Sequence, residues 1–268
     1  MHCSLTTLLA TVAAVLAFLP CSIYGNWRVR QKLLNEVFRG YNRLVPPQDN
    51  ITQPVTVGIE LRVLKLLKLD QEEQSVSIIG WIQLTWRDPR LSWDDGKFEG
   101  VDHLVVPTKK IWTPDITLQR SDDVMKQLSD VNARLVYSGA LRLTLPYILK
   151  TPCKTEPEDR EATCYIRLGS WTTDTSQIDV NPVSDRANAL DMERNRRWEM
   201  LKIKSYRQEE RGQSVPGEVA SYVVFEMNMR KRKGVDEPEK MENAGSTAVM
   251  SLMLLLLSVL VTSLRTVV

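Results

Sequence analysis

The sequence predicts an all-β fold, an antiparallel β-sandwich in a single domain, with one helix ahead of it. From Val55 onward apolar and polar residues alternate with a period of two, which is typical of strands that bury one face. Turn-rich stretches, and no helical segments, separate these runs, and this order favours antiparallel pairing. The runs are VTVGIELRVLKLL (55–67), SVSIIGWIQLTW (75–86), ARLVYSGALRLTL (133–145), CYIRLGSW (164–171) and SYVVFEMNMRKR (221–232).

The predicted helix lies within residues 26–44. Apolar residues recur there at the spacing of one helix face, and the pattern ends before Pro46-Pro47, where a helix cannot continue. We therefore expect one domain over residues 26–232. The apolar positions of the helix are Leu33, Leu34, Val37, Phe38 and Tyr41.

Composition and residue inventory argue against several classes of function. The chain has 268 residues and a net charge of +2, which gives no sign of a nucleic-acid partner. His103 has no nucleophile motif near it, ligands for zinc are lacking, and no glycine-rich phosphate loop occurs. We expect a protein that is not an enzyme and that needs no cofactor or metal.

The first 25 residues read as a signal peptide, because a short apolar run at 8–19 is followed by small residues. An N-terminal anchor is the alternative. Cleavage would remove Cys3 and Cys21, so Cys153 and Cys164 would remain and should form a disulfide in an oxidising compartment. Closing this short loop is worth roughly 3 kcal/mol. Asn50 begins the sequon Asn-Ile-Thr, which predicts glycosylation of a secreted chain.

The C-terminal part predicts attachment to a membrane. Residues 233–247 are polar and lack periodicity, as in a linker, and residues 248–264 form an apolar run without charge. That run fits either a single transmembrane span or the tail of a GPI-attachment signal. Either one would hold the folded domain at the extracellular face of the plasma membrane.

The tryptophans and their neighbours recur in an order known from one family. The series is Trp81, Trp86-Arg-Asp, Ser-Trp93-Asp, Ile-Trp112-Thr-Pro-Asp115, Tyr137-Ser-Gly139, Cys164 with Gly-Ser-Trp171, Trp198-Glu199 and Met229-Arg-Lys-Arg. In this order the chain resembles the ligand-binding domains of Cys-loop receptors of the nicotinic type and the soluble acetylcholine-binding proteins. The resemblance covers residues 27–233. It implies a helix-capped β-sandwich that assembles as a homo- or hetero-pentamer.

The resemblance also implies a ligand site at the junction of two subunits, where aromatic side chains surround an amine such as acetylcholine by cation–π attraction. Trp171 matches the central tryptophan of this site. Trp81, followed by Gln83, matches the part that the neighbouring subunit supplies. Several positions depart from the pattern. Gln119 stands where receptors have a tyrosine, and residues 214–216 replace the Cys-Cys-Pro hairpin.

Two tyrosines near that hairpin, Tyr206 and Tyr222, are out of register with the receptor tyrosines, and a shifted hairpin could bring one of them into the site. Arg142 and Thr144 stand where apolar contacts are common. An arginine about 6 Å from a bound ammonium would oppose binding by about 3 kcal/mol at an effective dielectric constant of about 20.

The cysteine-enclosed loop departs from receptors as well. In receptors it carries an apolar stretch that contacts the channel domain, whereas here it reads KTEPEDREAT and should be hydrated. We therefore expect no channel formed by this chain itself. Two functions remain open at this point. One is a membrane-tethered extracellular protein that binds a small ligand, and the other is an accessory protein that associates with related receptor subunits without binding a ligand.

Overall fold

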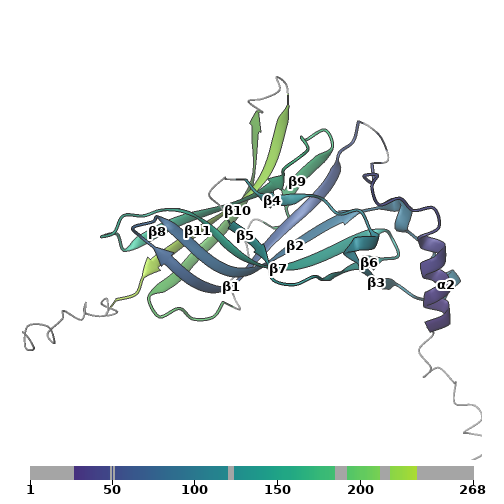
Figure 1. The fold of residues 1–268 in the computed structure, drawn as a ribbon, viewed down its shortest axis with the longest axis horizontal. Helices are drawn as coiled ribbons and strands as arrows, with labels where there is room; N and C mark the ends of the chain where they lie inside the picture. Colours follow the sequence, from purple (N-terminus) through teal and green to yellow (C-terminus); the bar gives the residue numbers. More distant parts are fainter. Residues whose placement is uncertain are drawn as a thin grey trace, which may run out of the picture.

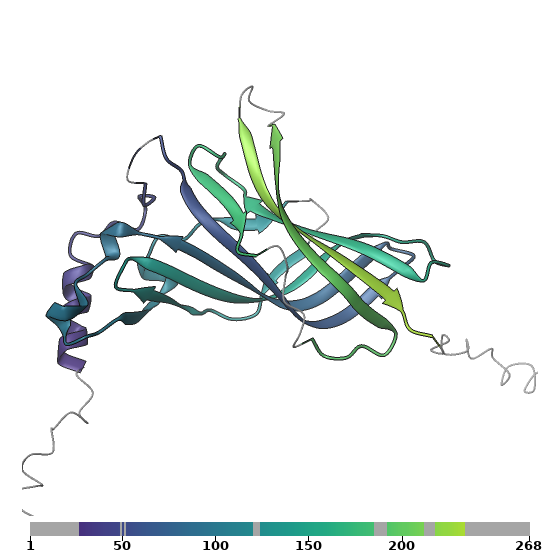
Figure 2. The same cartoon turned by 180° about the vertical axis from the view of Figure 1, so that it is seen from behind.

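The computed structural model describes residues 27–48, 50, 52–119, 124–184, 192–211 and 218–233. Within them a helix stands at one end of two twisted sheets of long strands (Figures 1 and 2). The predicted signal peptide, the hairpin at 214–216 and the C-terminal apolar segment lie outside these residues. No helix of the described part is long and apolar enough to cross a membrane.

The helical elements are α2 (Trp27–Val37) and three short 3₁₀ helices, η1 (Pro89–Leu91), η2 (Asp95–Phe98) and η3 (Thr108–Lys110). The strands are β1 (Val55–Asp70), β2 (Ser75–Arg87), β3 (His103–Pro107), β4 (Ile116–Leu118), β5 (Val124–Gln127), β6 (Asn132–Val136), β7 (Ala140–Lys154), β8 (Glu161–Ser170), β9 (Ile178–Pro182), β10 (Trp198–Arg211) and β11 (Val219–Lys231).

Strand pairing confirms the predicted sandwich. One sheet contains β1, β2 and β7 with the shorter β3, β5, β6 and β9, and the other contains β4, β8, β10 and β11. The sheets meet at the ends of β7 and β8, where Cys153 is opposite Cys164. The pairing is antiparallel except that β9 runs parallel to β1.

Three strand boundaries differ from the alternation in the sequence. The run at 133–145 forms two strands, β6 and β7, because Gly139 turns the chain with φ of +80°. The period of two does not reveal β9, which has only five residues. The period of two does not reveal β10 either. A bulge between Met200 and Lys202 shifts which residues of that strand face inward.

The core lies between the sheets and contains the inward-facing positions of the alternating strands. Every second residue from Val55 to Val63 on β1 is buried, and the same holds for Leu141 to Leu149 on β7. The facing sheet contributes Ile166 and Leu168 from β8 and Phe225, Met227 and Met229 from β11. On β1 and β7 the residues between these positions are exposed or half-buried, so they can face solvent or another molecule.

The predicted disulfide between Cys153 and Cys164 is confirmed. The loop that it encloses is polar and exposed from Glu156 to Arg160, as its composition predicts. Gln71, in the turn after β1, donates from Nε2 to the carbonyls of Glu156 at 2.7 Å and Asp159 at 2.9 Å. Side-chain hydrogen bonds therefore hold this loop, in place of an apolar contact.

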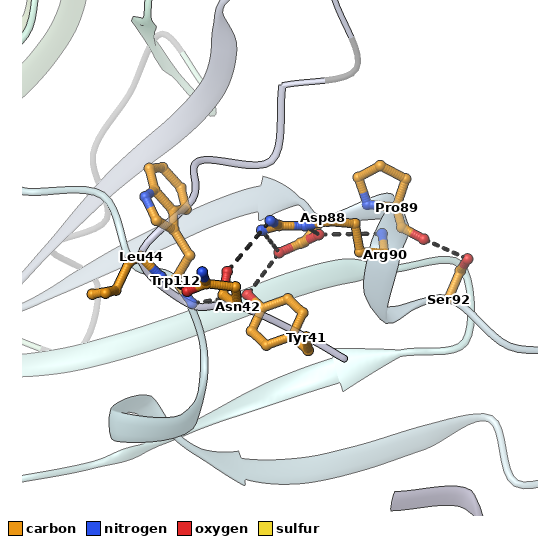
Figure 3. Close-up of polar contacts among 8 residues, drawn as sticks. All are labelled: Tyr41, Asn42, Leu44, Asp88, Pro89, Arg90, Ser92 and Trp112. Carbon is orange, nitrogen blue, oxygen red and sulfur yellow. Dashed lines mark hydrogen bonds and ion pairs between the residues drawn. The ribbon is translucent and has the colours of Figure 1, made fainter. Parts of the chain in front are cut away.

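A buried carboxylate connects the helical end of the molecule to the sandwich (Figure 3). Asp88, with no exposed surface, accepts from Arg90 Nε at 2.8 Å and Nη2 at 2.7 Å, and from the hydroxyl of Tyr41 at 2.8 Å. That hydroxyl in turn accepts from the backbone N–H of Trp112 at 2.9 Å. Burial is the largest cause that raises the pKa of Tyr41 to about 12.

Candidate functional site

Trp171 stands directly after β8, in a turn that one carboxylate organises. Asp115 accepts from the backbone N–H of Trp171 at 3.2 Å, from the N–H of Thr172 at 3.0 Å, and from the hydroxyls of Ser170 and Thr172 at 2.7 Å each. Trp171 is nevertheless 66% exposed. The chain thus fixes the backbone that carries a large aromatic side chain and leaves its ring uncovered.

A small cavity of about 270 Å³ lies beside this turn. The structure brings Trp171, Gln119 and Tyr222 together in its wall. Tyr222 is opposite Gly169 across β8 and β11, and a Cβ on that glycine would lie 2.6 Å from the tyrosine ring. Only a glycine therefore allows Tyr222 to lie over β8 at this point. The remaining wall is polar and includes Asp174 and Glu218.

Gln119, which replaces the receptor tyrosine, is bound to the strand below it. Its Nε2 donates to the carbonyl of Gly169 at 2.9 Å and to that of Thr117 at 3.2 Å. The amide therefore stabilises the junction of β4 and β8, and it supplies no aromatic face to the cavity.

Arg167 is a neighbour of this cavity that the sequence reasoning missed. Its guanidinium carbon is 4.0 Å from the ring centroid of Tyr222, and its Nη2 is 2.5 Å from Oε1 of Glu210. Its Nε has no hydrogen-bond acceptor among the described residues. Burial raises the pKa of Tyr222, and the charge of Arg167 acts in the opposite direction. The sequence signal was one cation in the otherwise uncharged alternation CYIRLGSW.

Tyr206, the other candidate tyrosine, lies on β10 opposite Val224 and is outside the residues that line the cavity. Burial is the largest cause that raises its pKa, followed by the charge of Glu226. The hairpin that follows Arg211 includes the candidate positions 214–216, which lie outside the described residues.

Trp81 belongs to the other sheet and lies on the exposed face of β2. The residue is 40% exposed, and the guanidinium carbon of Arg62 is 5.9 Å from its ring centroid. Arg62 is directly opposite Trp81 in the pairing of β1 with β2. The sequence reasoning missed Arg62, because cross-strand neighbours depend on register.

The other residues predicted beside Trp81 lie further along the same exposed face, on β2 and β7. Gln83 donates to Glu60 at 3.1 Å and is opposite Thr144, whose hydroxyl is 3.5 Å from its Oε1. Arg142 is opposite Thr85, four residues along β2 from Trp81, which corresponds to about 13 Å. The guanidinium that faces Trp81 is that of Arg62.

His103 was considered in the sequence as a catalytic candidate and set aside. His103 begins β3 and its Nδ1 is 2.6 Å from Oδ1 of Asp102, a hydrogen bond that lowers the pKa of that carboxyl. Within the described ranges no group of three or more His, Cys, Asp or Glu is arranged to hold a metal ion.

Two partial surfaces therefore face outward from one chain. One carries Trp171 and Tyr222 beside an acidic, polar cavity, and the other carries Trp81 on an exposed sheet face. The fold and these surfaces define the class of protein, a ligand-binding β-sandwich of the Cys-loop type.

Comparison with known proteins agrees with this class. Residues 30–233 match the family described as the neurotransmitter-gated ion-channel ligand binding domain, and the chain belongs to that family. It is 32% identical to neuronal acetylcholine receptor subunit alpha-6 of Rattus norvegicus over 182 residues, 66% of this chain and 37% of the relative. The goldfish Carassius auratus alpha-3 subunit is 31% identical over 182 residues (66% and 35%), and the Mus musculus alpha-4 subunit 32% over 187 residues (67% and 30%).

The chain spans about a third of the length of these relatives. The family is a class of receptor domains and not a class of enzymes, in agreement with the residue inventory.

Proposed function

We propose that the protein is an extracellular ligand-binding protein that binds a small organic cation at the junction of two subunits, with Trp171 from one subunit and Trp81 from the next. The observation that carries this proposal is the exposed indole of Trp171 on a backbone held by Asp115. A large aromatic side chain left bare on a firmly held backbone is typical of a binding surface.

The charges around Trp171 support a cationic ligand. Asp174 and Glu218 line the same cavity, and the π face of an indole attracts an ammonium by about 0.5–2 kcal/mol. The cavity of about 270 Å³ is at the small end for a ligand site, so a second wall from another subunit would complete it. Trp81, exposed on the opposite sheet, is suited to form that wall.

The ligand should be larger than acetylcholine. Gln119 adds no ring, and the face of Trp81 is already occupied by Arg62. Cation–π attraction to a small ammonium is therefore weak, and affinity must come from apolar area buried against the two indoles. A bulky amine with an aromatic or alicyclic body meets this requirement.

A second function is favoured by a different observation. Two candidate aromatic rings, Trp81 and Tyr222, already have an arginine of the same chain over them. An accessory protein that associates with related receptor subunits needs the sandwich and its edges but no open cation site. In that case Trp171 would pack against the neighbouring subunit.

Delivery and anchoring belong to the same proposal. Residues 1–25 would direct secretion, Asn50 would carry a glycan, and residues 248–264 would hold the domain, residues 26–232, at the outer face of the plasma membrane through the linker at 233–247. The protein would assemble as a pentamer of itself or with related subunits. It would form no channel of its own, and it would use no cofactor.

The deciding experiment is a calorimetric titration of a panel of amines into the purified full-length protein. We expect one bulky amine to bind more tightly than acetylcholine, and both Trp171→Ala and Trp81→Ala to weaken it about tenfold or more. The matched control is Trp27→Ala, because Trp27 is 64% exposed on α2, away from both surfaces. If no amine binds, or if all three variants behave alike, the accessory function replaces ligand binding.

A further inference from the structure

A second cavity, of about 800 Å³, opens on the exposed face of β2, β6 and β7 and carries three arginines. It contains neither Trp81 nor Trp171. Its walls are Thr56, Gly58, Thr85, Trp86, Arg87, Arg134, Val136, Ala140, Leu141, Arg142 and Val183. We call it the arginine groove.

Strand register brings the arginines together. Thr85 of β2 is opposite Arg142 of β7, and Arg142 is opposite Arg134 of β6. Residues directly opposite each other project from the same face of a sheet, about 5 Å apart. The neighbouring pair, Leu135 with Leu141, is buried, so both arginines are on the outward face. Arg87 is one row further along β2, opposite Ala140.

Like charges directly opposite each other destabilise a sheet unless an opposite charge lies between them. Among the described residues, neither Arg134 nor Arg142 makes a hydrogen bond or an ion pair with its guanidinium. Nε of Arg87 donates to the carbonyl of Ser138 at 3.1 Å, which places its guanidinium at the rim. Within the part of the chain that the structure describes, this sheet face therefore carries concentrated positive charge, and no ion pair offsets Arg134 or Arg142 there.

The acidic residues closest in register to the groove are engaged elsewhere. Asp179 of β9 is opposite Thr56 and accepts from Nη2 of Arg207 at 2.7 Å. Glu60, one row from Gly58 on β1, accepts from Gln83 at 3.1 Å. Asp102 is 2.6 Å from the ring of His103, and the charge of Arg134 reaches it only as a minor influence. Among the described residues, none of these three carboxylates forms an ion pair with Arg134 or Arg142.

The floor of the groove is made of small and apolar groups. A Cβ on Gly58 would lie 2.5 Å from Oγ1 of Thr85 and 3.1 Å from Cγ2 of Val183. The glycine therefore leaves space here that a side chain would fill. Ala140 continues the floor across β7. Guanidinium groups bind carboxylates in a two-pronged geometry, and a small carbon skeleton can rest on such a floor.

We propose that the arginine groove binds a small organic anion with two or more carboxylate groups. Arg134 and Arg142 each hold one carboxylate from the sheet face, and Arg87 closes the groove at its rim. The Cα positions of Thr85 and Trp81 are about 13 Å apart along β2, so this site is separate from the amine site and does not depend on it.

Citrate is the probe, titrated by calorimetry into the purified full-length protein. We expect measurable binding that weakens as sodium chloride is raised from about 50 mM to about 300 mM, because salt screens the exposed guanidinium groups. Arg134→Gln and Arg142→Gln should each lower the affinity about tenfold, and the double variant should abolish binding. Arg39→Gln, on an exposed turn outside the groove, is the control and should bind as the wild type does.

Thermal unfolding without ligand gives an independent readout. Each single variant removes one of two facing charges, so its melting temperature should equal or exceed that of the wild type. Citrate should no longer raise the melting temperature of the variant. A fall in melting temperature for both variants would show that the guanidinium groups have partners within the fold, and would overturn the proposal.

The remaining outcomes also decide the question. If citrate stabilises the double variant as much as the wild type, its effect comes from the solution and not from binding in the groove. The proposal would then be wrong. If citrate does not bind but the double variant sediments as a smaller species, the groove holds an acidic segment of a second copy, and the small-anion proposal fails.

Discussion

Replacement of Arg62 by leucine is the perturbation that tests most directly how the site is assembled. The guanidinium carbon of Arg62 is 5.9 Å from the ring centroid of Trp81 and competes with any ligand cation for that ring. An exposed cation–π contact of this kind is worth about 0.5–1 kcal/mol, which a ligand must replace.

The charge of Arg62 adds a second cost. An ammonium on the other side of the indole would be roughly 10 Å from the guanidinium, where partly screened repulsion is on the order of 1 kcal/mol. The two effects together predict that Arg62→Leu strengthens binding of an organic cation by about 1–2 kcal/mol, or about 5- to 30-fold. Leucine also keeps apolar contact with the ring.

The assay is calorimetric titration with the best amine of the panel, with Arg142→Leu as the matched variant. Arg142 is on the same face but about 13 Å from Trp81 along β2, so its removal should change the affinity less than about twofold. The reasoning is refuted if Arg142→Leu improves binding more than Arg62→Leu, or if neither variant changes it while Trp81→Ala does.

Four further predictions concern stability and processing. Gly169→Ala should destabilise the fold by about 2 kcal/mol in urea unfolding, because the added Cβ meets Tyr222 and a backbone carbonyl; a neutral result would mean that the ring has room to move. Asp88→Asn should cost about 2–3 kcal/mol by the same measurement, because it weakens the buried contacts with Arg90 and Tyr41, whereas the exposed Asp130→Asn should change stability by less than about 0.5 kcal/mol. The pKa of Tyr41 is raised to about 12, so its contribution is present below pH 10 and is lost as the pH rises from about 10 to 12, since the unfolded chain loses that proton first. Allowing for partial exposure, wild type should lose about 1 kcal/mol more than Tyr41→Phe over that range, and equal losses would contradict the assignment. Truncation after residue 243 should release the protein from cells into the medium, and a phosphatidylinositol-specific phospholipase should release the full-length form only if the anchor is GPI.

Much of the fold was predictable because it depends on local alternation. The period of two in the run from Val55 places Val57, Ile59 and Leu61 on one face of the strand, whichever strand it pairs with. That face is buried, so it must lie between the two sheets. β10 was not predicted because its bulge at Met200 breaks the period. The helix α2 ends at Val37, earlier than the apolar pattern to Tyr41 suggests, because Gly40 turns the chain with φ of +70°, and Tyr41 then bonds with Asp88.

For the site, the sequence alone determined which residue types are present and where they fall along the strands. The tryptophans, the polar cysteine-enclosed loop and the missing ring at Gln119 all follow from the order of residues. The family could be inferred from the same order, because a series of motifs at defined separations carries more information than any one of them.

Only the tertiary structure decided which of these residues meet. Register alone places Arg62 over Trp81, moves Arg142 away from it and sets Arg142 beside Arg134. The packing of β8 on β11 brings Arg167 over Tyr222, and Asp115, which lies just before β4 and more than fifty residues earlier in the chain, holds the turn of Trp171. A charge acts over distances of a few ångströms, and the order of residues along a chain does not determine such distances between strands. The pairing of strands sets them.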